Sequence, residues 1–211
     1  MGQWNGVDLD GLVLTGDRLT LRPWHPGDAS EVTSIMADPA MHEFLPLPNP
    51  YTRADADHFV TELGHAGRRS GTGIGNAVVE TATGRLVAAA ELRLPKPRET
   101  MSEIGYWVAV AARGNGYAAE ATRTLAAWAF DHGVHRVEIR CAARNVASAK
   151  TALAAGFRFE GLMRGRELTP HGPEDGLLFG RLASDAGDAL SAGPDGTIRA
   201  EARLTLGRPR S

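Results

Sequence analysis

The stretch YWVAVAARGNGYAAEAT, residues 106–122, changes character at the Arg-Gly-Asn-Gly in its centre. The residues before the glycines are apolar and rich in valine, which is typical of a strand buried on both faces. After the glycines, alanines recur at helical spacing with Leu125, Trp128 and Phe130, which predicts a helix that begins near Tyr117. A glycine-rich turn between a strand and a helix presents backbone N–H groups at the positive end of the helix dipole. The turn is therefore a candidate anion-binding site.

Three interpretations of this turn compete. Gly114-x-Gly116-x-x-Ala119 fits the dinucleotide-binding fingerprint, and Glu138 lies at about the separation of that fingerprint's ribose-binding carboxylate. The context counts against this interpretation, because about a hundred residues precede the motif and Glu138 falls inside a predicted strand. A nucleotide-binding P-loop is excluded, since no Lys-Ser/Thr pair follows the glycines. A plain tight turn and a pyrophosphate loop that begins at Arg113 remain open.

The remaining chain predicts an α+β fold. Alternating apolar residues predict a first strand that ends at Arg22, and Thr52 opens an amphipathic helix. A glycine-rich segment, residues 64–75, is expected to be a mobile loop, and a hairpin that turns at Thr83-Gly84 follows it. Further elements are expected as strands at residues 102–110, 134–142, 157–167 and 176–184 and as helices at about 117–132 and 148–156. This order indicates a mixed, mostly antiparallel sheet flanked by helices instead of a repeating βαβ array.

One domain with a C-terminal extension is predicted. A chain of 211 residues suits a single domain, which we place at residues 1–184. From residue 185 to residue 211 the composition turns to Gly, Ala, Asp and Pro, as in a linker. Within this extension, TIRAEARLTL, residues 197–206, alternates apolar and polar side chains, which fits either an extra strand or a disordered tail. The apolar face of such a strand needs a cover, so a homodimer with exchanged tails is a hypothesis.

Bulk properties exclude several classes of protein. With 23 Lys and Arg against 25 Asp and Glu, the chain lacks the basic surplus of a protein with a large nucleic-acid footprint. The one cysteine, Cys141, cannot form an internal disulfide. The N-terminus lacks the layout of a signal peptide, and no segment approaches the roughly 20 apolar residues that span a bilayer. We therefore expect a cytoplasmic protein with no membrane partner.

A second segment strengthens the pyrophosphate interpretation. NVASAKTALAAGF, residues 145–157, has an Asn, a small residue three positions later and a closing Gly-Phe. Together with the turn, it gives the chain a resemblance to the GCN5-related N-acetyltransferase family that covers nearly all of residues 15–183. The segments SEIGYWV and RVEIRCAARNVAS are most similar to the subgroup that acetylates the N-terminal amines of ribosomal proteins. The resemblance implies the family's fold, in which two central strands splay apart.

The same resemblance implies that acetyl-coenzyme A is the co-substrate and indicates which residues bind it. Backbone amides of the turn would hold the pyrophosphate, which agrees with the need of a helix N-terminus for acceptors. The strand before the turn would pair with the pantetheine arm, although its valines equally fit a buried strand. Asn145 would bind the pantetheine amide, and its alternative is a turn residue. The implied cofactor-binding residues are Val108, Val110, Arg113, Gly114, Asn115, Gly116, Tyr117, Ala118 and Asn145.

Acyl transfer to an amine also needs a base and a proton donor for the leaving thiolate. Glu103, at the mouth of the central strand, is the candidate base, and an exposed strand-end carboxylate is the alternative; Glu91 is the reserve. The family's usual donor, a tyrosine seven residues after Asn145, is replaced here by Ala152. The ribosomal-protein subgroup uses a serine three residues after that Asn, which is Ser148, although Ser148 could also cap the helix.

These residues predict an N-acetyltransferase that transfers an acetyl group directly to a primary amine in a ternary complex. No metal is expected, because His132 and His135 lack a third ligand at suitable spacing. The acceptor would be a protein N-terminus or a small-molecule amine, and the sequence does not identify it. A transferase of the same fold that uses another acyl donor, including aminoacyl-tRNA, remains an alternative. A non-catalytic acyl-coenzyme A binder is the alternative from a different class.

Overall fold

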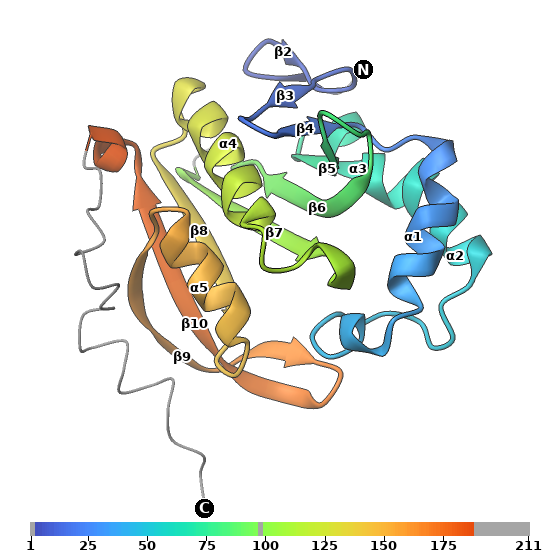
Figure 1. Cartoon of the computed structure of the whole chain (residues 1–211). Coiled ribbons are helices and arrows are strands. Elements are labelled where there is room, and N and C mark those ends of the chain that lie inside the picture. Colours follow the sequence, from blue (N-terminus) through green and yellow to red (C-terminus); the bar gives the residue numbers. More distant parts are fainter. Residues whose placement is uncertain (1–2, 97–98, 188–211) are drawn as a thin grey trace, which may run out of the picture.

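The computed structural model describes residues 3–96 and 99–187, and the predicted tail strand at residues 197–206 lies outside them. An eight-stranded sheet forms the centre, in the order β3-β4-β5-β6-β7-β8-β10-β9 (Figure 1). A small separate hairpin of β1 (Gln3–Trp4) and β2 (Val7–Asp8) precedes it. The strands of the large sheet are β3 (Leu14–Thr15), β4 (Leu19–Arg22), β5 (Gly73–Glu80), β6 (Leu86–Arg93), β7 (Met101–Val108), β8 (Arg136–Ala142), β9 (Arg158–Thr169) and β10 (Gly172–Leu182).

Helices cover both faces of the sheet (Figure 1). Two of them, α4 (Tyr117–Asp131) and α5 (Val146–Ala154), pack on one face. The other face carries α1 (Ala29–Met36), α2 (Arg53–His58) and α3 (Gly64–Ser70), the last two joined by the π-helical turn η3 (Phe59–Leu63). Short 3-10 turns are η1 (Pro26–Asp28), η2 (Pro39–Met41), η4 (Val110–Ala112) and η5 (Ala183–Gly187). No helix in the described part of the chain has the length and apolar character needed to cross a membrane.

The predicted α+β class is confirmed, and so is the splaying of two central strands. All neighbouring strands of the large sheet pair antiparallel except β7 and β8, which run parallel. Their pairing covers only three positions, from Met101 opposite Arg136 to Glu103 opposite Glu138. Beyond Glu103, β7 pairs only with β6 and β8 only with β10, so the two strands diverge (Figure 1). We call this opening the fork.

The glycine-rich segment 64–75 is ordered, which corrects our expectation of a mobile loop. It forms α3 and the start of β5. Its glycines allow close packing: a Cβ on Gly64 would lie 2.3 Å from the Trp24 ring, and one on Gly75 would lie 2.6 Å from the Gly64 carbonyl oxygen. The glycines therefore mark close contacts of α3, which composition alone does not distinguish from a loop.

A buried arginine ties the N-terminal segment to the sheet. Arg68 of α3 is 1% exposed, and its guanidinium donates hydrogen bonds to the carbonyl oxygens of Leu9, Leu12 and Gly75 and to Oδ1 of Asn76. Burial without a carboxylate partner in contact lowers the pKa of Arg68 to about 10. The residue therefore connects α3, β5 and the chain before β3 through polar contacts inside the core.

Candidate active site

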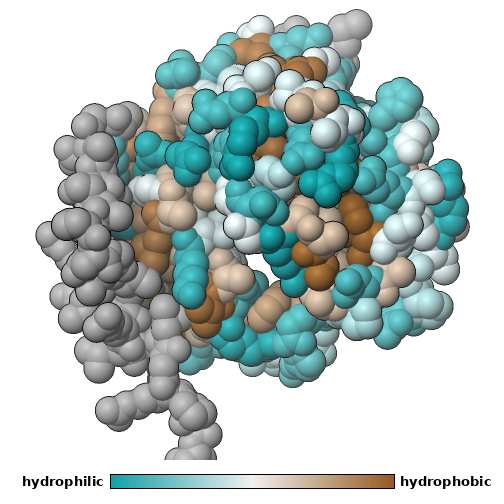
Figure 2. All heavy atoms as spheres, in the orientation of Figure 1, coloured by the Kyte–Doolittle hydropathy of each residue, from teal (hydrophilic) through white to brown (hydrophobic). Residues whose placement is uncertain are grey.

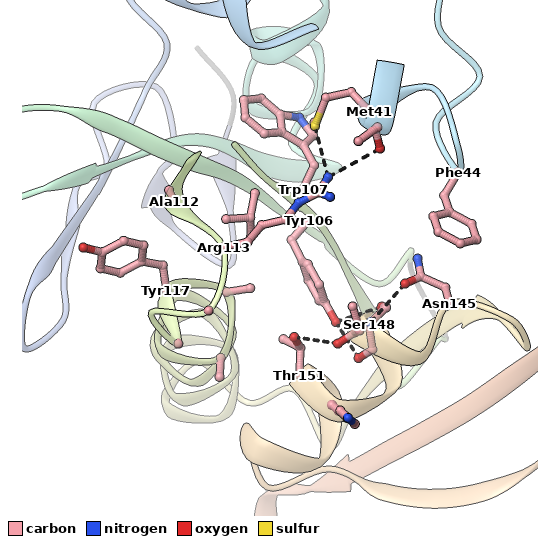
Figure 3. A pocket seen from close by; sticks show the side chains of 18 of the residues that line it. Met41, Phe44, Tyr106, Trp107, Ala112, Arg113, Tyr117, Asn145, Ser148 and Thr151 are labelled. Carbon is pink, nitrogen blue, oxygen red and sulfur yellow. Dashed lines mark hydrogen bonds between the residues drawn. The ribbon is translucent and has the colours of Figure 1, made fainter. Parts of the chain in front are cut away.

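A cavity of about 660 Å³ lies at the fork. The end of β7, the glycine turn, the first turns of α5 and the loop at residues 40–45 line it. Figure 2 shows the molecule hollowed near the centre of this face, and Figure 3 shows the side chains that surround the hollow. Residues from three separate parts of the sequence therefore meet around one space.

The glycine turn has the geometry of an anion site. Gly114 and Gly116 have φ angles of 81° and 77°, a left-handed conformation that favours glycine. Gly116 is the N-cap of α4, and no side chain caps this helix end. The N–H groups of its first turn are therefore left to a ligand or to water. The side chain of Asn115 folds back and donates to the carbonyl oxygens of Ala112 and Arg113, at 3.1 and 3.2 Å.

Arg18, just before β4, contacts both the glycine turn and the first turn of α4. Its Nη2 donates to the carbonyl oxygen of Asn115 at 3.1 Å, and its guanidinium lies 5.1 Å from the centre of the Tyr117 ring. The Glu120 carboxylate, which is 4% exposed, accepts from the backbone N–H and from Nε of Arg18, at 2.7 and 2.9 Å. Arg18 thus connects the first turn of α4 to the start of β4.

Ser148 lies at the centre of a hydrogen-bond network on the other side of the cavity (Figure 3). The Asn145 side chain caps α5 by accepting from the Ser148 backbone N–H at 3.1 Å. The Tyr106 hydroxyl lies 3.0 Å from Oγ and 3.1 Å from the carbonyl oxygen of Ser148. Burial raises the pKa of Tyr106 to about 12 and that of the neighbouring Cys141 thiol to about 11. Both groups therefore stay protonated at neutral pH.

Most of the predicted site residues gather around this cavity. Those that line it are Val108, Arg113, Gly114, Gly116, Tyr117, Ala118, Asn145 and Ser148. Asn115 contributes backbone to the turn but does not line the cavity, and Val110 packs in η4 against the core beneath α1 and α2. The Arg113 side chain points to the loop, with Nη2 3.4 Å from the Ala40 carbonyl oxygen and 3.5 Å from the Met41 sulfur (Figure 3).

Glu103 is separate from these residues. It occupies the last paired position of β7 before the fork, and its carboxylate lies 2.6 Å from Arg140 and 3.5 Å from Arg93. It lines a second cavity, of about 460 Å³, toward the start of β7 together with Glu91 and residues of α3. The structure therefore places the candidate base and the candidate acid at two different cavities.

The loop at residues 40–45 also lines the cavity, through Ala40, Met41, Glu43, Phe44 and Leu45. Arg144, after β8, holds this loop: Nε lies 2.7 and 2.8 Å from the two oxygens of Glu174, Nη1 binds Glu43, and Nη2 donates to the Glu43 carbonyl oxygen at 3.1 Å. The guanidinium also lies 4.4 Å from the centre of the Phe44 ring. We call Arg144, Glu43, Phe44 and Glu174 the loop clasp. It joins the loop to the β9–β10 hairpin across the mouth of the cavity.

Tyr106 was missed, although the sequence carried a signal for it. In a strand, residues two apart share a face, so Tyr106 lies on the same face of β7 as Ile104 and Val108. That face points to α5, which explains why the phenol meets Ser148. Among the residues that the structure describes, no group of three or more His, Cys, Asp or Glu side chains is arranged to hold a metal ion.

Comparison with known protein families identifies the domain. A family model described as the acetyltransferase (GNAT) domain matches residues 18–158. The chain belongs to the GNAT acetyltransferase family. It is therefore an acyltransferase, and the glycine turn, the fork and the whole of α5 lie inside the matched region.

Solved structures show the same fold. RimJ from Mycobacterium smegmatis, in complex with a CoA disulfide, is 20% identical, with a TM-score of 0.73 over 84% of this chain and 90% of that one. The ribosomal-protein-S5-alanine acetyltransferase of Vibrio fischeri is 17% identical, with a TM-score of 0.69 over 82% and 98%. The microcin C7 self-immunity acetyltransferase MccE, in complex with acetyl-CoA and AMP, is 20% identical, with a TM-score of 0.72 over 79% and 93%. A search of curated proteins found no match to this GNAT chain.

Proposed function

We propose that this GNAT protein transfers an acetyl group from acetyl-CoA directly to a primary amine. The observation that carries the proposal is the combination, at one cavity, of an uncapped helix N-terminus after two left-handed glycines with a stretch of β7 that is unpaired on its β8 side. The CoA and acetyl-CoA complexes of RimJ and MccE, which share the fold, support it.

The residues around the fork suit the parts of acetyl-CoA. The N–H groups of residues 114–118 would donate hydrogen bonds to the pyrophosphate oxygens, and Arg113 adds positive charge at the same turn. Beyond Glu103, the cavity side of β7 has free backbone groups that an amide-bearing chain can pair with, as an added strand would. Asn145 lies at the opposite wall. Acetyl-CoA supplies an activated acyl group. The protein's own task is therefore to position the amine, to accept a proton from it and to donate a proton to the leaving thiolate.

Ser148 is the proposed proton donor to the leaving thiolate, because its hydroxyl lines the cavity beside β7. Glu103 is the proposed base, acting through water along the open side of β7. Gly105 lies in the chain between Glu103, which lines the second cavity, and Tyr106, which lines the first. A Cβ added to Gly105 would meet no atom within 4 Å, so this face of the strand has room for water.

A protein N-terminal amine is the proposed acceptor. An α-amine has a reference pKa of about 7.7–8.0 against about 10.4 for lysine, so a base acting through water deprotonates it more easily. RimJ and the Vibrio fischeri enzyme share the fold, and the latter acetylates a ribosomal protein by its description. A small-molecule acceptor is the second candidate, because MccE combines this fold with bound AMP.

Calorimetric titration with CoA, acetyl-CoA and NADH tests the co-substrate first. We expect micromolar binding of both CoA compounds and none of NADH, followed by CoA release when peptides with free N-termini are added. Glu103→Gln and Ser148→Ala should each lower the rate about 100-fold while CoA affinity is retained. The surface variant Arg53→Ala is the control, because its pairing with Asp57 is exposed and distant. Absence of CoA binding would refute the proposal, and CoA binding without transfer to any amine would leave a non-catalytic acyl-CoA binder.

A further inference from the structure

The direction in which the Ser148 proton points depends on the hydrogen bond between its hydroxyl and Tyr106. A hydroxyl has one proton and two lone pairs. The Tyr106 phenol lies 3.0 Å from Ser148 Oγ, and either oxygen can be the donor. If the phenol donates, Oγ accepts and the Ser148 proton is left to point into the cavity, which Ser148 and Tyr106 both line.

Tyr106 is placed to act on Ser148 from a different element. It comes from β7, whereas Ser148 and Thr151 lie one turn apart on α5. Thr151 donates its own proton to the Ala147 carbonyl oxygen at 3.0 Å, so it offers the phenol only lone pairs. At position 152 of the same helix, Ala152 is fully buried and has no polar group to offer. The phenol of Tyr106 is therefore the acidic hydroxyl nearest to Ser148.

A serine by itself is a poor proton donor to a thiolate. Once its proton leaves, an alkoxide remains, and an alcohol is a much weaker acid than a phenol, even one whose pKa burial raises to about 12, as in Tyr106. A phenol hydrogen-bonded to Oγ removes this difficulty, because it can pass its proton to Oγ as the serine proton departs. The stabilisation is largest when charge develops on oxygen in the transition state.

We propose that Tyr106 is the proton source behind Ser148 in the release of CoA. This inference rests on the proposed function. When the bond between the acyl carbon and sulfur breaks, the electron pair goes to sulfur, the Ser148 proton moves to sulfur, and the Tyr106 proton moves to Oγ. The phenolate then takes back the proton that the acceptor ammonium released to water. Tyr106 is a positioning residue in this scheme, because it acts through Ser148 without touching the substrate.

A competing geometry makes the proposal testable. The Tyr106 hydroxyl also lies 3.1 Å from the Ser148 carbonyl oxygen. A proton donated there would leave the phenol oxygen as an acceptor and would turn the Ser148 proton away from the cavity. In that arrangement, Tyr106→Phe would free Ser148 and leave the rate unchanged or higher.

The kinetic experiment compares Tyr106→Phe, Ser148→Ala and the double variant, with Tyr51→Phe as the matched loss of a phenol outside the cavity. We expect kcat to fall about 100-fold in each single variant and no further in the double variant, since both groups serve one proton transfer. The dissociation constant of CoA should stay within about twofold and the melting temperature should not change. Multiplicative losses, or full rate in Tyr106→Phe, would overturn the proposal.

A binding experiment tests the same contact without turnover. CoA is titrated calorimetrically between pH 7 and 10 in buffers of different ionisation enthalpy, which reports the pKa of the bound CoA thiol. A hydroxyl that donates to sulfur stabilises the thiolate, so we expect this pKa to be lower in the wild type than in either single variant. An unchanged thiol pKa in both variants would contradict the scheme. Failure of the wild type to bind CoA would instead refute the proposed function itself.

Discussion

Single residues decide the shape of the glycine turn. Gly114 and Gly116 supply backbone angles that other residues adopt only under strain, and Arg18 fixes the Asn115 carbonyl beneath them. Steric crowding does not require a glycine at either position. An added Cβ would meet no atom within 4 Å at Gly114, and at Gly116 it would meet only Arg18, at 3.7 Å. Backbone conformation is therefore the reason for both.

Gly116→Ala is expected to lower the free energy of unfolding by about 1–2 kcal/mol, the cost of a left-handed residue with a side chain. It should also weaken CoA binding, because relief of the strain moves the N–H groups of the first turn of α4. Gly11→Ala is the control, since Gly11 has ordinary backbone angles and open space around it. Chemical denaturation and CoA titration measure both effects. Equal behaviour of the two variants would show that the left-handed angle is not needed.

The sequence predicted this turn correctly because glycine spacing reflects the local backbone. It did not predict the surroundings of Glu103 or Arg113, because their partners come from distant segments. Glu103 meets Arg140 from β8, and Arg113 meets Met41 from η2. Such contacts depend on how strands and loops pack, which spacing along one segment does not encode.

Between elements, the loop clasp joins the loop at residues 40–45 to the β9–β10 hairpin. Its charged groups are partly exposed, with the Arg144 and Glu43 side chains 36% and 47% accessible, so solvent weakens the ion pairs. Hydrogen bonding to Arg144 lowers the pKa of Glu174. The clasp therefore contributes more to the position of the loop than to stability.

Arg144→Ala should raise the KM for the amine acceptor while the CoA dissociation constant stays unchanged, because the loop lies across the mouth of the cavity. Stability should change by less than about 1 kcal/mol. Hydrogen exchange of residues 40–45 should become faster in the variant. Arg53→Ala removes a comparably exposed ion pair and serves as the control. An unchanged acceptor KM together with faster exchange would show that the loop does not contact the acceptor.

Local signals predicted most of the elements. Thr52 caps α2 as expected, with Asp55 completing a capping box, and the hairpin between β5 and β6 turns at Gly84, where φ is 73°. The glycine-rich segment 64–75 was mistaken for a loop because its glycines serve packing against Trp24 and within α3 and β5. Periodicity identifies which residues face a core, but it does not show how closely two backbones approach.

Across the domain, Arg68 links α3 and β5 to Leu9 and Leu12, which lie 59 and 56 residues earlier in the sequence. A buried cation is costly to desolvate, and here hydrogen bonds to four acceptors, those of Leu9 and Asn76 fully buried, offset that cost. Its removal leaves those acceptors without donors. The N-terminal segment, through Leu9 and Leu12, depends on this contact for its attachment to α3.

Arg68→Met is expected to lower the free energy of unfolding by at least about 3 kcal/mol, because several buried carbonyl groups lose their partners. For a domain of this size that corresponds to a melting temperature lower by roughly 6–12 °C. The adjacent variant Arg69→Met should change stability by less than about 0.5 kcal/mol, since Arg69 is exposed and pairs with Glu62 at the surface. Calorimetry of both proteins measures the difference, and similar melting temperatures would contradict the role of Arg68.

The fork has a consequence for the protein when no co-substrate is bound. Because β7 and β8 share only three paired positions, the sheet contains an interior seam with unpaired backbone groups. An unpaired strand edge is a template for pairing with other chains. A bound pantetheine arm would occupy the β7 side of that seam as a substitute strand. The co-substrate would then act as a folding partner, and the supply of CoA in the cell would help to protect the enzyme from aggregation.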